Sequence, residues 1–361
     1  MTPLLAARRI AMLVVAASAV VAVLAGLTRL GWSVPFASER ATEHGPLLVL
    51  GVFGTLIALE RAVALGTPWA YGAPVAGAIG AASALAGMPA VASRLALALS
   101  VLLVAVNVAI VRRQSAPFTR IMLLGSIVLV AGTAAWAAGL PIFAVVPTWL
   151  VFFALTIVAE RIEMSRLAPT PPWAASLIAA ACVAMAAFAT ASLVWPGIGV
   201  RLLGASFVIV AAWELRFDLA RRTVRQRGLP RFAALGVLAG ALWLGASGVG
   251  LVAVGLPPAG PIYDALLHTV FVGFVVSMVF AHAPIILPAV ARVRIAFRPA
   301  FYAPLVLLHA ALLTRVAGDL LGMSELRRGG GLGNAAAIAL FVATAFLPRR
   351  SPRAGSPRSC A

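Results

Sequence analysis

Long apolar runs fill almost the whole chain and decide what it can fold into. A helix of about 20 apolar residues crosses the hydrocarbon core of a bilayer, and a helix satisfies its own backbone polar groups there. The sequence therefore predicts an all-α, polytopic membrane protein with about twelve transmembrane helices. The expected spans lie near residues 10–30, 44–65, 69–88, 92–111, 119–138, 141–160, 172–195, 197–215, 232–254, 262–288, 299–321 and 333–348.

The composition leaves no room for a large soluble domain, because 63% of the residues are hydrophobic and only 11% are charged. We expect one transmembrane domain over residues 1–348 and a short basic tail over residues 349–361. The net charge of +18 does not indicate a nucleic-acid-binding protein, because the basic residues lie in short clusters between the apolar runs. The expected partner of most of the surface is the lipid bilayer.

The arginine distribution predicts the orientation of the chain. If the N-terminus is cytoplasmic, 21 of the 28 basic residues fall on the cytoplasmic side. An excess of arginine in cytoplasmic loops is the usual signal for membrane topology. The sequence therefore predicts an inner-membrane protein with an even number of spans and with both termini in the cytoplasm. Seven arginines are left on the outer side, namely Arg29, Arg40, Arg94, Arg201, Arg315, Arg327 and Arg328.

All four histidines of the chain lie within the apolar runs or at their edges. An imidazole in hydrocarbon is costly without a partner, and imidazole is the commonest metal ligand. His44 and His268 are expected near the outer face, whereas His282 follows His268 by 14 residues, or about 21 Å of helix. His309 is midway along its span. These depths predict an outer pair, His44 with His268, and an inner pair, His282 with His309.

Two imidazoles on neighbouring helices can supply the axial ligands of a b-type haem, and copper is the other candidate. Each histidine can instead hydrogen-bond across helices or line a proton path. His282 can also be an interfacial residue at a proline-broken helix end. Since His268 and His282 are nearly four turns apart, they are expected to share roughly one helix face.

Three segments have a similar outline and suggest an internal repeat. They are residues 51–61, 150–161 and 270–282, and they fall in spans that are four apart. This spacing predicts three four-helix units around a pseudo-threefold axis, with limits near residues 1–115, 116–228 and 229–348. The sequences Glu60-Arg61 and Glu160-Arg161 end two of these segments. We expect ion pairs there, or alternatively a role in proton uptake.

The chain resembles the NnrS family of membrane haem and copper proteins, which is linked to nitric oxide metabolism, and more distantly subunit I of the haem-copper oxidases. The first carrier of the resemblance is His44 with the stretch HGPLLVLGVFG, and the second is His268 with the stretch HTVFVG. His282 falls where the NnrS family has a later Gly-His. The resemblance implies bound haem b, with copper as a second candidate, and the handling of nitric oxide or electron transfer. If the chain is an enzyme, the resemblance implies an oxidoreductase acting on nitric oxide or a respiratory electron carrier.

The chain also departs from the oxidases. Their copper histidines lie on spans six and seven, and the corresponding segments 141–160 and 172–195 contain no histidine. Reduction of oxygen to water is therefore not expected. A further likeness to the oxidases is an arginine pair before the last span, here Arg327-Arg328, which with Arg315 would contact haem propionates. The other interpretation of this pair is a solvated loop beside Glu325. We expect Arg315 itself to pair with Asp319, four residues later.

Two other classes of function fit the same features. Twelve spans with repeats and proline- or glycine-broken helices are also typical of secondary transporters. A non-catalytic sensor or an assembly factor of a respiratory complex would share the histidines. Metal content separates the haem protein from the transporter, and a spectral change with a gas ligand such as nitric oxide separates an enzyme or sensor from a passive electron carrier.

Overall fold

The computed structural model describes residues 3–35, 37–167, 170–291 and 295–346, and every regular element in these ranges is a helix. The expected tail, residues 349–361, lies outside the described residues. The first half of the chain contains α1 (Pro3–Arg29), η1 (Ser38–Glu43), α2 (His44–Pro46), η2 (Leu47–Gly54), α3 (Thr55–Leu65), η3 (Pro68–Tyr71), α4 (Gly72–Leu85), α5 (Pro89–Arg113), α6 (Pro117–Ala137) and α7 (Ile142–Ser165). The second half contains α8 (Pro172–Ala191), α9 (Pro196–Phe217), α10 (Ala220–Thr223), α11 (Leu229–Val254), α12 (Pro261–His268), η4 (Thr269–Val276), α13 (Ser277–Ala291), η5 (Pro299–Phe301), α14 (Tyr302–Leu321) and α15 (Ser324–Phe346).

Eleven helices within the described residues are long and apolar enough to cross a membrane. The expectation of a polytopic, all-helical membrane protein is thereby confirmed. The outer helices turn large apolar side chains outward, as Leu13, Val249 and Leu313 do, and lipid covers such side chains in a membrane protein.

The expected span 69–88 is shorter in the structure than in the sequence pattern. It consists of the single turn η3 and of α4, which has 14 residues and is therefore about 21 Å long. The hydrocarbon core is about 30 Å thick, so α4 alone does not cross it. The apolar run is longer than the helix because apolar residues continue through the turn at Gly87, whose φ is +77°.

The last helix begins nine residues before the expected start at 333. The turn occurs at Gly322, whose φ is +69°, and α15 begins at Ser324, so Arg327 and Arg328 lie in a helix and not in a loop. The glycines that follow do not break this helix, because they allow it to pack closely on α14. A Cβ atom on Gly330 would overlap the backbone nitrogen of Arg315.

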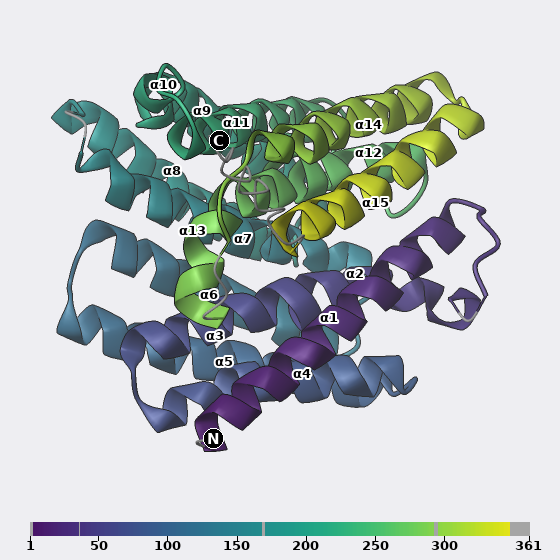
Figure 1. Ribbon diagram of the computed structural model, residues 1–361, viewed down its shortest axis with the longest axis horizontal. Helices are drawn as coiled ribbons and strands as arrows, with labels where there is room; N and C mark the ends of the chain where they lie inside the picture. Colours follow the sequence, from purple (N-terminus) through teal and green to yellow (C-terminus); the bar gives the residue numbers. More distant parts are fainter. Residues whose placement is uncertain (1–2, 36, 168–169, 292–294, 347–361) are drawn as a thin grey trace, which may run out of the picture.

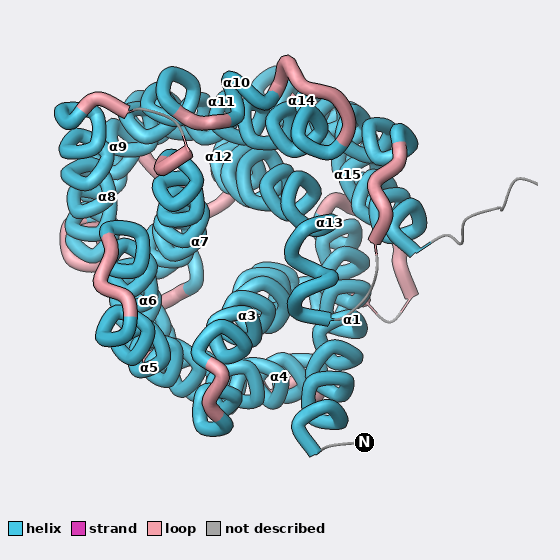
Figure 2. Tube along the Cα trace, turned by 60° about the vertical axis from the view of Figure 1, so that its left-hand side comes forward, coloured by secondary structure: helices cyan, strands magenta, loops and turns pink. Residues whose placement is uncertain are grey.

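Most of the long helices run roughly across the view of Figure 1. Figure 2 shows that they form a ring, with α3, α7 and α12 inside it. Burial agrees for two of them: 78% of the apolar stretch of α7 and 67% of that of Pro261–Ile285 is buried, against 28% for α1. The span Ser38–Leu65, which contains α3, is 56% buried. The inner segments are the ones that share the repeated outline. The three pseudo-repeats themselves remain a prediction.

Two of the inner segments contain a π-helical stretch. The first, η2, begins three residues after His44, and the second, η4, begins directly after His268. π-helical turns are rare in proteins, and those that do occur are often found at functional sites. The wider turn redirects the side chains next to it. The third inner segment, α7, is α-helical throughout and contains Pro147. The π-helical stretches therefore accompany the histidines.

Gly204 of α9 and Gly248 of α11 bring two helix backbones into contact. A Cβ atom on Gly204 would lie 2.7 Å from the carbonyl oxygen of Gly248. Because a backbone carbonyl cannot give way easily, we expect Gly204→Ala to lower the free energy of unfolding by about 1–3 kcal/mol. Gly197→Ala is the matched control, since a Cβ atom there meets open space. Thermal unfolding of both variants in detergent measures the difference, and equal midpoints would contradict the close approach.

Candidate functional site

The structure brings His44 and His268 together, although 223 residues separate them in the sequence. Their ring centroids are 6.2 Å apart and their planes are inclined by 20°. His44 begins α2, and His268 ends α12. Two imidazoles that ligate one metal from opposite sides have ring centroids about 6 Å apart, because each metal–nitrogen bond is about 2 Å long. The observed separation matches that arrangement.

One nitrogen of each ring is held by a backbone carbonyl. His44 Nδ1 lies 2.7 Å from the carbonyl oxygen of Ala22, and His268 Nδ1 lies 2.8 Å from that of Asp264. A carbonyl oxygen only accepts hydrogen bonds, so Nδ1 donates in both cases and Nε2 of the neutral ring carries the lone pair. In the part of the chain that the structure describes, neither Nε2 atom has a hydrogen-bond partner. Metal-ligating histidines characteristically have this arrangement.

Gly26 of α1 makes room for the His44 ring. A Cβ atom at Gly26 would lie 2.6 Å from His44 Cε1 and 2.7 Å from His44 Nδ1. The ring can therefore reach the carbonyl of Ala22, one helical turn earlier, only because residue 26 has no side chain. Nothing in the sequence marks Gly26, which is one of 32 glycines and lies in an apolar run.

A buried ion pair supports His268. Asp264 Oδ1 lies 3.3 Å from His268 Nδ1, and both carboxylate oxygens of Asp264 accept hydrogen bonds from Arg315, at 2.7 and 2.8 Å. This two-pronged contact joins α12 to α14 and is the strongest geometry available to an arginine–carboxylate pair. The expected pairing of Arg315 with Asp319 is therefore wrong. Arg315 points instead to the neighbouring helix, where two of its guanidinium nitrogens donate to the carboxylate of Asp264.

Arg327 and Arg328 have other partners. Arg328 Nη1 lies 3.1 Å from Glu325 Oε1, and its guanidinium lies 4.9 Å from the centroid of the Trp32 ring. Arg327 Nε lies 3.8 Å from Oδ1 of the buried Asp319. These contacts place both arginines at the junction of α15 with α14 and with the end of α1. Their expected role at haem propionates stays a prediction.

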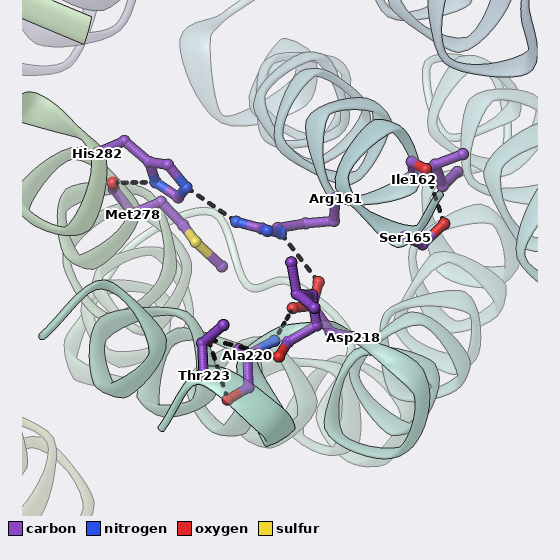
Figure 3. A network of polar contacts seen from close by, with 9 residues as sticks. Arg161, Ile162, Ser165, Asp218, Ala220, Thr223, Met278 and His282 are labelled. Atoms are coloured by element: carbon purple, nitrogen blue, oxygen red, sulfur yellow. Dashed lines mark hydrogen bonds and ion pairs between the residues drawn. The ribbon is translucent and has the colours of Figure 1, made fainter. Parts of the chain in front are cut away.

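His282 is bound to an arginine and not to another histidine. Its Nε2 lies 2.8 Å from Arg161 Nη1, and its Nδ1 lies 2.8 Å from the carbonyl oxygen of Met278 (Figure 3). Since a guanidinium only donates, Nε2 of His282 is the acceptor and Nδ1 is the donor. Both ring nitrogens are thus engaged. Arg161 also donates from Nε to Asp218 Oδ2, at 2.9 Å.

His309 is likewise fully engaged. Trp243 Nε1 donates to its Nδ1 at 3.0 Å, and its Nε2 lies 3.3 Å from Ser277 Oγ. The Ser277 hydroxyl in turn donates to the carbonyl oxygen of Gly236, at 2.7 Å. The expected inner pair of His282 and His309 is therefore wrong, because the depth of a residue along a helix does not fix the direction of its side chain. Neither ring offers a free nitrogen to a metal.

The side chains around the His44–His268 pair bear on the two candidate cofactors. Within the described ranges, no group of three or more histidine, cysteine, aspartate or glutamate side chains could hold a metal ion. A copper site made only of protein ligands draws on more donors than two imidazoles. A haem takes at most two axial ligands from the protein, because its macrocycle supplies the other four. The residues present therefore fit a haem better than copper.

Comparison with known proteins gives one match. The model of a family described as "Domain of unknown function (DUF8744)" matches residues 8–349, which is nearly the whole chain. No curated protein and no solved structure matches the chain.

Proposed function

We propose that this chain, which belongs to the DUF8744 family, binds haem b between His44 and His268 and serves electron transfer or the handling of nitric oxide. The observation that carries the proposal is the pair of Nε2 atoms left without partners on two rings 6.2 Å apart, with both Nδ1 atoms held by backbone carbonyls. Haem held by two histidines supplies one-electron redox chemistry. The resemblance to the NnrS family supports nitric oxide as the ligand or substrate.

The residues around the pair have distinct roles in this proposal. His44 and His268 would be the axial ligands, and Gly26 admits the His44 ring against α1. The backbone carbonyl and the side-chain carboxylate of Asp264 orient the His268 ring, as carbonyls and carboxylates do for metal-bound histidines. Arg315 holds Asp264 in place with two hydrogen bonds. Because His44 and His268 would together hold the haem and leave no ligand position for a gas, the proposal favours electron transfer over turnover of nitric oxide.

The proposal includes the topology. With the turn η3 and the short helix α4 counted together as one span, the chain crosses the membrane twelve times and both termini are cytoplasmic. The arginine asymmetry supports this orientation, and the inner (plasma) membrane of the cell is the expected location. The His44–His268 pair would then lie near the outer face, and Arg161 near the cytoplasmic face.

Absorption spectra of the purified protein test the proposal. We expect the native chain, oxidised and dithionite-reduced, to show a six-coordinate b-type haem spectrum. His44→Ala and His268→Ala should each lose that spectrum, because one axial ligand is removed from a site that has only two. His309→Gln is the control and should keep it, since His309 has no free nitrogen in the structure.

The outcomes separate the alternatives. A colourless protein from haem-replete cells would overturn the haem proposal and favour a transporter. A normal spectrum in His44→Ala or His268→Ala would mean that the substituted histidine is not a haem ligand. A spectrum that changes on titration with nitric oxide would favour an enzyme or a sensor over an electron carrier.

A further inference from the structure

A second group of polar residues lies among the inner helices, one π-helical stretch away from the His44–His268 pair. We call it the Arg161 cluster. It contains four carboxyl groups, two guanidinium groups and one imidazole, from Glu60, Arg61, Glu160, Arg161, Glu214, Asp218 and His282. Its residues come from α3, α7, α9, the residue after α9, and α13.

The two arginines of the cluster have defined partners. Arg61 donates to Glu60, and its Nη2 lies 4.0 Å from Glu160 Oε1. Arg161 bridges Asp218 and His282, as Figure 3 shows. The side chain of Asp218 is fully buried, and its second oxygen accepts from the backbone nitrogen of Ala220, at 2.7 Å. Each guanidinium is thus committed to one carboxylate at close range.

Glu214 is the member without a partner. It is fully buried, and neither of its carboxyl oxygens has a hydrogen-bond partner within the described chain. It lies on α9, one helical turn before Asp218, and interacts electrostatically with Asp218 and Arg161. The thiol of Cys182 on α8, which is also buried, interacts electrostatically with Glu214. The arginines at the start of α10 and α11, namely Arg221, Arg222 and Arg231, are exposed.

The charges of the cluster do not balance if every carboxyl is ionised. Four carboxylates would then face two guanidiniums. The side chains of Glu60 and Glu160 are about a quarter exposed, whereas those of Asp218 and Glu214 are fully buried. Burial of an ionised carboxylate without a partner costs several kcal/mol, and the group binds a proton instead. Asp218 has a guanidinium and a backbone donor, whereas Glu214 has neither. Two carboxyls are thus in excess of the guanidiniums. Glu60 and Glu160 are partly open to solvent, so Glu214 is the fully buried carboxyl without a compensating charge.

We infer that the Arg161 cluster is a proton-binding site and that Glu214 carries its proton. The proton sits on a carboxyl oxygen of Glu214, in the bilayer, on the side of the fold away from the His44–His268 pair. His282 stays neutral there, because its Nε2 accepts from Arg161 while its Nδ1 donates to Met278. If Glu214 releases its proton, Arg161 is the described cation placed to compensate the new charge. The ligand of the site is thus a proton, held by Glu214.

Infrared spectroscopy of the whole protein in lipid vesicles tests this inference. At neutral pH we expect a carbonyl stretching band of a protonated carboxyl that shifts in D₂O and is absent in Glu214→Gln. Glu160→Gln is the matched control, because it removes a partly exposed carboxyl of the same cluster and should keep the band. A band that survives in Glu214→Gln would overturn the assignment of the proton.

A second measurement does not depend on how the variant folds. In the native protein the band should persist at neutral pH and disappear only in alkaline buffer. Absence of any protonated carboxyl band at neutral pH would overturn the inference.

The thermal stability of Glu214→Gln is a further check. Glutamine imitates a neutral acid, so this variant should unfold at the same temperature as the native chain. A large loss of thermal stability would indicate an ionised Glu214 paired with Arg161. The inference does not rest on bound haem, and a colourless protein serves equally well in both measurements.

Discussion

Arg161→Leu should lower the free energy of unfolding by about 3–5 kcal/mol, because it leaves a buried carboxylate without its counter-ion. Asp218 is fully buried and would retain only the backbone nitrogen of Ala220 as a donor. His282 would lose the donor to its Nε2 as well. The measurement is unfolding of the purified protein in mixed micelles, with the native chain beside the variant.

A double variant separates the lost charge pair from lost packing. In Arg161→Leu/Asp218→Asn no charge is left unpaired, and the amide can still accept from Ala220, so most of the lost stability should return. Arg120→Leu is the control for removal of an arginine, since Arg120 is exposed and bonds only to Ser115. If the effects of the two substitutions simply add, Arg161 and Asp218 are not coupled.

Gly26→Ala should abolish haem binding in a chain that remains folded. The added methyl group would lie 2.6 Å from His44 Cε1, so the ring must leave the carbonyl of Ala22 and turn its Nε2 away from His268. We expect the loss to be as complete as in His44→Ala, although the ligand itself is unchanged. Haem content per protein, from the absorption of the purified variant, measures it.

Gly45→Ala provides a control next to the same histidine. A Cβ atom at Gly45 meets no other atom within 4 Å, so this variant should bind haem as the native chain does. Circular dichroism should show unchanged helix content in both variants. Full haem content in Gly26→Ala would mean that His44 does not need its contact with α1, and equal loss in both variants would point to a general weakness of this region.

The sequence predicted the spans well where apolar runs and helices coincide, and failed where they do not. Proline marks the start of α5, α6, α8 and α9, as it does in many helices. α4 was predicted too long because apolar residues continue into the turn at Gly87. α15 was predicted to start too late because a run of glycines usually ends a helix, whereas here it allows close contact with Arg315. Such contacts depend on a second helix and cannot be seen in one segment.

Part of the candidate site could also be predicted. A rise of about 1.5 Å per residue was enough to place His44 and His268 at one depth. It was not enough to pair His282 with Arg161, because the facing of each helix depends on packing across α7 and α13. The carbonyl of Ala22 and the space at Gly26 are backbone features, and they cannot be predicted from residue types.

The π-helical stretch η4 sets the angle, about the axis of the inner helix, between the two polar sites. One extra residue in a helical turn rotates everything beyond it by about 100°, so His268 and His282 need not share the face that 14 residues of regular helix would give them. If the same residues Thr269–Val276 adopted regular α-helical winding, one histidine would turn out of its site, although no side chain that contacts it would change. The winding of this stretch, more than its composition, therefore fixes the angle between the two ends of the inner helix.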